Sequence, residues 1–172
     1  MVAGFVVLGG CTVAFGAALR EALGGHGGTG QGRWRGGAGP APRLIQGAGL
    51  LAIAAGLLRR DRMLLTPGSN SWHNHAHDVV SMVVYLDLVA AQVLLAARFG
   101  RDPEPGAQTW RRWQAWLLAC GVATGAVLLA FAADTSAAGA GVLQRVAVTI
   151  PLGAVAAVAV RLLRTPARSG WP

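Results

Sequence analysis

Five long apolar runs, separated by short polar segments, are the feature that most constrains how this chain can fold. The runs lie near residues 2–23, 42–58, 76–99, 113–133 and 138–163. A helix needs about 20 mostly apolar residues to cross the hydrocarbon core of a bilayer, and each run reaches or approaches that length. Backbone polar groups must be satisfied internally in hydrocarbon, which favours helices. The sequence therefore predicts an all-α, polytopic transmembrane helix bundle of about five helices, forming a single domain over residues 1–172.

The composition excludes an ordinary water-soluble domain. Only 13% of the residues are charged and 53% are hydrophobic, whereas soluble domains carry about 25% charged residues. Many of the apolar positions are Gly or Ala, which let helix backbones approach closely in lipid. Gly49 and Gly56 share one face of their helix, and Gly121 and Gly125 are four residues apart. These spacings predict packing contacts and a possible homo-oligomer formed through small-residue helix faces.

The positive charges predict the orientation of the chain in the membrane. The net charge is +8, but the arginines stand in short clusters between apolar runs, which favours contact with the lipid bilayer and no nucleic-acid binding. Arg59, Arg60 and Arg62 fall between the second and third runs, and most others fall on the opposite side. The positive-inside rule then predicts a multi-pass protein of the cell membrane, with the N-terminus outside and the C-terminus cytoplasmic. Three tryptophans beside Arg111 and Arg112 are typical of an aromatic belt at the cytoplasmic interface: Trp110, Trp113 and Trp116.

The sharpest chemical motif lies at the start of the third run. His73 and His77 are four residues apart, so they share one face of a helix and could coordinate the same metal ion. Asp78 follows His77, and Asp61 in the preceding loop could fold back to complete a divalent metal site, for example for zinc. The motif first predicts a polar cluster at the outer membrane interface that is structural or binds a small ligand. The alternative is a metal-dependent hydrolase acting on lipid headgroups.

Two charged residues stand inside the apolar runs. Asp87 lies roughly 15 Å below His77 at 1.5 Å rise per residue, and Arg145 lies several residues into the last run. A charge at the centre of a spanning helix costs about 2.5–3.5 kcal/mol on insertion scales, so such groups usually face the bundle interior and pair. Arg145 is expected to pair with Asp78 or Asp87. The pair could fix helix register, or it could serve a small proton-coupled transporter.

Four motifs, taken in order, resemble one family of bacterial proteins. They are Gly47-Ala48-Gly49-Leu50 with the later Asp61, His73-x-x-x-His77-Asp78, Trp110-Arg111, and Gly141-Val142-Leu143-Gln144-Arg145. This order resembles the multi-pass membrane family described as domain of unknown function 998, which is common in actinobacteria. The resemblance implies about six spanning helices, of which the first is missing here, and no particular activity, so whether the chain is an enzyme stays open. It also implies a set of recurring polar positions: Asp61, His73, His77, Asp78 and Arg145.

Overall fold

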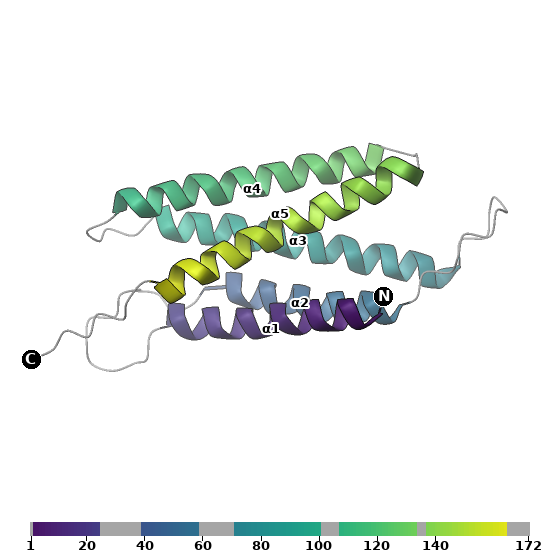
Figure 1. Cartoon of the computed structure of the whole chain (residues 1–172), viewed down its shortest axis with the longest axis horizontal. Coiled ribbons are helices and arrows are strands. Elements are labelled where there is room, and N and C mark those ends of the chain that lie inside the picture. Colours follow the sequence, from purple (N-terminus) through teal and green to yellow (C-terminus); the bar gives the residue numbers. More distant parts are fainter. Residues whose placement is uncertain (1, 25–38, 59–70, 101–106, 134–136, 165–172) are drawn as a thin grey trace, which may run out of the picture. The chain divides into compact units, whose positions relative to one another are not determined.

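The described part of the chain is entirely helical in its regular structure. The computed structural model describes residues 2–24, 39–58, 71–100, 107–133 and 137–164. These ranges contain α1 (Val2–Gly24), α2 (Ala41–Leu57), α3 (Trp72–Gly100), α4 (Ala107–Ala133) and α5 (Ala137–Arg164) (Figure 1). α1, α3, α4 and α5 contain segments long and apolar enough to cross a membrane, whereas α2 is shorter. The predicted all-α transmembrane bundle is confirmed, with four spans meeting the length criterion.

Two helices begin earlier than the hydropathy pattern predicts. α3 begins at Trp72 and not near residue 76, and α4 begins at Ala107 and not near residue 113. The first turn of α3 is closed by bonds from the backbone N–H groups of Asn74 and His75 to the carbonyl of Ser71, at 3.1 and 3.3 Å. Hydropathy marks only the part of a helix that suits hydrocarbon, and polar side chains at an interface leave the helix free to continue. The histidines of the motif are therefore helical.

Helix packing divides the chain into two compact units, Met1–Ala91 and Gln92–Pro172, so that α3 contributes to both. In the first unit, α1 and α2 pack together through glycines. A Cβ atom built on Gly49 would lie 2.7 Å from the carbonyl oxygen of Gly9 and 2.8 Å from the backbone nitrogen of Val13. Likewise, a Cβ atom on Gly56 would collide with Phe5. Glycine is therefore needed for this close approach, as the spacing of Gly49 and Gly56 predicts.

In the second unit, α4 packs against α5, and the end of α3 packs against α4. A Cβ atom on Gly121 of α4 would lie 3.6 Å from the side-chain oxygen of Gln92, within ordinary contact. By contrast, a Cβ atom on Gly125 would meet no other atom within 4 Å, so Gly121 packs within the described part of this chain, and a packing role for Gly125 stays a prediction. Pro151 lies inside α5 and is buried.

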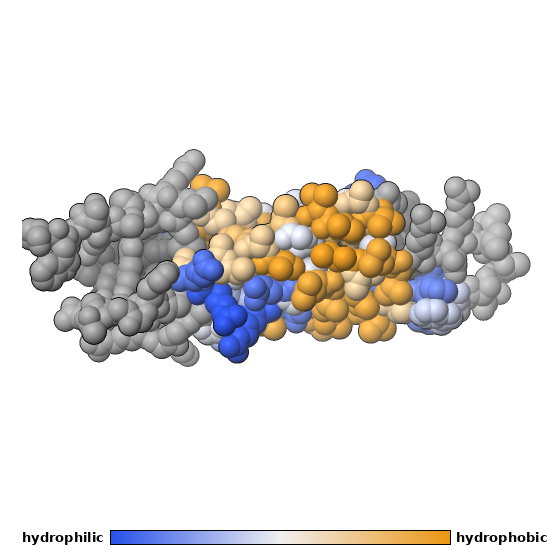
Figure 2. All heavy atoms as spheres, turned by 90° about the horizontal axis from the view of Figure 1, so that it is seen from below, coloured by the Kyte–Doolittle hydropathy of each residue, from blue (hydrophilic) through white to orange (hydrophobic). Residues whose placement is uncertain are grey.

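The surface of the helices suits lipid. Large apolar side chains are exposed on both units, including Val79 at 64%, Val122 at 73% and Leu129 at 74%. On the face seen in Figure 2, hydrophobic side chains gather in a band, with hydrophilic side chains beyond it. The hydroxyls of Thr12, Thr124 and Thr149 each donate 2.8 Å hydrogen bonds to the carbonyl four residues earlier. These bonds satisfy the threonines within their own helices, where water is absent.

Candidate functional site

His77 joins α3 to the end of α2. Its Nδ1 atom lies 2.9 Å from the carbonyl oxygen of Ala55 and 3.1 Å from that of Leu58. Both partners are acceptors, so Nδ1 is the donor and carries the proton. The carbonyls of the last turn of a helix lack intrahelical partners, and the imidazole supplies one from the neighbouring helix. In the neutral ring, this tautomer leaves Nε2 as a hydrogen-bond acceptor or metal ligand.

The imidazole of His77 is also held by an aromatic contact. The ring of Phe5 on α1 meets it edge to face, with centroids 6.5 Å apart and an interplanar angle of 81°. Such edge-to-face pairs are a favoured arrangement of aromatic rings. All three helices of the first unit therefore contribute to the orientation of His77: α1 through Phe5, α2 through its carbonyls, and α3 through the residue itself.

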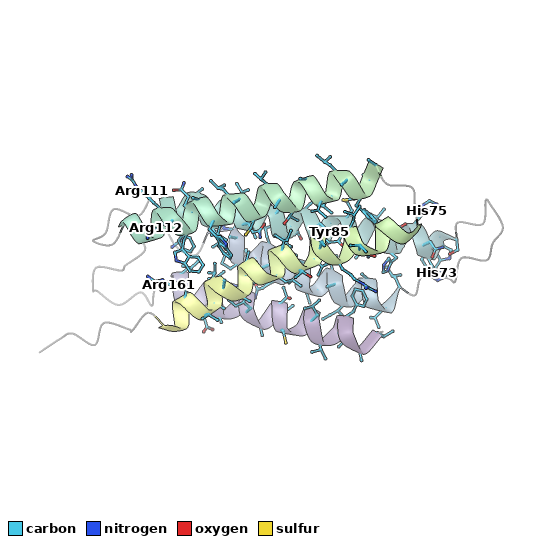
Figure 3. The ribbon with its side chains drawn as sticks, turned by 45° about the horizontal axis from the view of Figure 1, so that its top comes forward. His73, His75, Tyr85, Arg111, Arg112 and Arg161 are labelled. Carbon is cyan, nitrogen blue, oxygen red and sulfur yellow. The ribbon has the colours of Figure 1, made fainter. Side chains whose placement is uncertain are left out.

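His73 lies one turn nearer the start of α3 and has different surroundings. Its ring stacks on that of Trp72, with centroids 3.7 Å apart and an interplanar angle of 29°. Trp72 is 67% exposed, as expected of a tryptophan at a membrane interface. His75 is exposed, and Figure 3 shows it with His73 at the same end of α3. The start of α3 therefore presents the stacked rings of Trp72 and His73 and the exposed imidazole of His75.

The three remaining residues of the predicted cluster, Asp78, Asp61 and Arg145, differ in where they lie. Asp78 is exposed on α3, beside His77. Asp61 lies outside the described residues. Arg145 is exposed on α5 and belongs to the second unit, so its pairing with Asp78 or Asp87 stays a prediction. Among the side chains that the structure describes, no three His, Cys, Asp or Glu lie where they could hold one metal ion. The four-ligand metal site likewise stays a prediction.

Asp87 lies on the span of α3 and packs on the α2 backbone. A Cβ atom built on Gly47 would lie 3.4 Å from the carboxylate oxygen Oδ2 of Asp87. The side chain is half-buried. Within the described ranges the carboxylate has no hydrogen bond or ion pair. Asp87 is therefore a carboxylate at membrane depth that lies against a glycine of the neighbouring helix α2.

Gln92 is a buried polar residue that the sequence prediction did not include. Its side chain is 0% exposed. Neither its amide nitrogen nor its amide oxygen has a hydrogen-bond partner in the described part of the chain. A glutamine in the middle of an apolar run is itself a signal, because polar groups are expensive inside a membrane. The prediction singled out the charged residues Asp87 and Arg145 inside the runs and did not include this amide.

The fold and these side chains define the class of protein: a multi-pass integral membrane protein with polar groups at one end of a span and inside it. The model of the family described as protein of unknown function DUF998 matches residues 1–161. The chain therefore belongs to that family, as its motifs predict. No curated protein and no solved structure matches the chain.

Proposed function

We propose that this membrane protein binds a small ligand at the Trp72 end of α3, on the outer face of the cell membrane. The observation that carries the proposal is the double contact of His77 Nδ1 with the carbonyls of Ala55 and Leu58. The contact gives His77 two roles, since one ring nitrogen ties α3 to α2 and the other stays available. The N-terminus is outside and the C-terminus cytoplasmic in this proposal, because the arginines favour the cytoplasmic side.

A divalent metal ion such as zinc is the ligand best suited to this arrangement. Histidines that bind metals usually donate their second ring nitrogen to a carboxylate or a backbone carbonyl, which fixes the tautomer and aims the free nitrogen. His77 has that second partner already. The other ligands would come from His73, Asp78 and Asp61, and a metal held by them could activate water for hydrolysis of a lipid headgroup.

Two substitutions of His77 separate its two roles. Asparagine keeps a donor near the position of Nδ1 but lacks Nε2, whereas alanine lacks both. We expect elemental analysis of the purified protein to find about one zinc per chain in the wild type and none in either variant. We expect His77→Asn to melt near the wild type. His77→Ala should lose roughly 1–2 kcal/mol of unfolding free energy, because its carbonyl partners lose their donor.

The control is His75→Ala, which removes an exposed imidazole of the same helix turn. It should keep both the metal and the melting temperature. A metal-free wild type would contradict the proposed ligand site and leave His77 as a structural residue. A His77→Asn variant as unstable as His77→Ala would contradict the two-role interpretation of its ring.

A second candidate function, proton-coupled transport, is favoured by Asp87. Carboxylates at membrane depth are typical of proton relays, and Asp87 has no hydrogen bond or ion pair among the residues that the structure describes. We expect Asp87→Asn to abolish proton flux into proteoliposomes, followed with a pH-sensitive dye, while the melting temperature stays near that of the wild type. The control is Glu21→Gln, since Glu21 is an exposed carboxylate on α1. Wild-type flux in Asp87→Asn, or failure of that variant to assemble, would contradict a transport role.

A further inference from the structure

A group of arginines lies at one end of the second unit. Arg98 is in the last turn of α3. Arg111 and Arg112 lie near the start of α4, and Arg161 lies near the end of α5. Figure 3 shows the last three at the same end of the pair formed by α4 and α5. These four residues are the arginine cluster.

The register of the helices supports this placement. A Cβ atom on Gly100 would collide with the side chain of Gln114, which brings the end of α3 to the first turns of α4. The contact of Gly121 with Gln92 follows the same antiparallel register. On α5, Arg161 is as far from Ala137 as Thr109 is from Ala133 on α4. α4 ends at Ala133, α5 begins at Ala137, and the two helices pack antiparallel. Arg161 on α5 therefore lies near the level of Arg111 on α4.

The arginine cluster brings positive charge to one end of the second unit. The described residues of the second unit contain no Asp or Glu. Arg111 and Arg112 also lie close to the N-terminus of α4, whose first turn has no acidic residue. The positive end of the helix dipole adds to their charge. This end of the unit therefore favours an anion.

The burial of the guanidinium groups differs within the cluster. The Nε atoms of Arg98 and Arg161 are buried, whereas Arg111 and Arg112 are exposed. Two arginines are thus held against the helices while two face outward. Beside them, the rings of Trp113 and Trp116 meet edge to face, with centroids 5.2 Å apart and an interplanar angle of 76°. Tryptophans at the end of a span mark the level of the lipid headgroups.

We propose that the arginine cluster binds the phosphate headgroup of an anionic phospholipid. Guanidinium groups match phosphate oxygens with paired hydrogen bonds, which makes arginine the residue suited to phosphate recognition. Basic pockets between transmembrane helices bind anionic headgroups in this way. Phosphate is the shared chemistry of a lipid headgroup and a free anion. The position at the end of the spans, beside the tryptophan pair, favours the lipid. This site is separate from the ligand site proposed at His77.

The test is a titration of the full chain in detergent with a short-chain phosphatidylglycerol, followed by tryptophan fluorescence. The same titration with phosphatidylcholine and with inorganic phosphate separates an anionic lipid from a zwitterionic one and from a free anion. We expect binding of phosphatidylglycerol alone. The double variant R111Q/R112Q should raise its Kd by roughly tenfold or more, because each arginine near the surface contributes about 1 kcal/mol to anionic lipid binding.

The matched control is R20Q/R43Q, which removes two exposed arginines from α1 and α2. It should change the Kd by less than about twofold. An equal loss in both double variants would overturn the proposal, because general charge attraction would then explain the binding. Equal binding of phosphatidylcholine, or binding of inorganic phosphate alone, would overturn it too. Arg111 and Arg112 are exposed, so their loss should leave the melting temperature unchanged and the test interpretable.

Discussion

Gly49→Ala is expected to force α1 and α2 apart and to lower the stability of the protein markedly. The added methyl would lie 2.7 Å from the carbonyl oxygen of Gly9 and 2.8 Å from the backbone nitrogen of Val13. Both are backbone atoms, so no side chain can turn aside and a whole helix must shift. Overpacking of this kind costs about 1–3 kcal/mol and occasionally more. In a chain of this size, each kcal/mol lowers the melting temperature by about 2–4 °C.

The measurement is thermal unfolding in detergent, and Gly10→Ala is the matched control. Gly10 stands next to Gly9 on α1, but a Cβ atom there meets nothing within 4 Å. We expect this variant to melt at or slightly above the wild-type temperature, since alanine favours a helix by about 1 kcal/mol over glycine. Equal melting of Gly49→Ala and Gly10→Ala would show that α1 and α2 do not approach as closely as described.

The helices and the family could be predicted from the sequence because both depend on local patterns. The apolar runs locate the spans, and the order of short motifs such as His73-x-x-x-His77-Asp78 identifies the family. The helix starts were less predictable. Trp72 to His75 are polar and lie outside the hydropathy signal, yet they continue α3. A polar interfacial turn is stabilised by its own backbone bonds, and hydropathy does not detect those.

The candidate site shows where prediction from local patterns ends. The spacing of His73 and His77 correctly places them on one helix, but it cannot say which atoms meet each ring. The partners of His77 are carbonyls some 20 positions earlier in the chain, at the end of α2. Every residue has a backbone carbonyl, so the residue types at positions 55 and 58 give no indication that Ala55 and Leu58 are the partners of His77. Only the packing of α2 against α3 brings these groups together.

Gln92→Leu is expected to stabilise the protein, although it replaces a residue that is 0% exposed. In the described part of the chain, neither polar atom of the amide has a hydrogen-bond partner. A buried, unsatisfied polar group costs about 1–3 kcal/mol. Leucine has a similar volume, and a Cβ atom built on Gly121 would still lie 3.6 Å from the amide oxygen, so there is room for a methyl group between the two residues. The melting temperature in detergent should therefore rise by several degrees at about 2–4 °C per kcal/mol.

Thr124→Val is the control for this prediction, because it removes an equally buried polar group that is satisfied. The hydroxyl of Thr124 donates to the carbonyl of Cys120 at 2.8 Å, and the residue is 0% exposed. Its loss should leave stability nearly unchanged or slightly lower. A lower melting temperature for Gln92→Leu would mean that the amide has a partner in the membrane, such as a bound water or ligand. The sign of the change in melting temperature therefore distinguishes two interpretations of Gln92. A rise means that its unsatisfied amide only destabilises the protein, and a fall means that the amide binds a water or ligand inside the second unit.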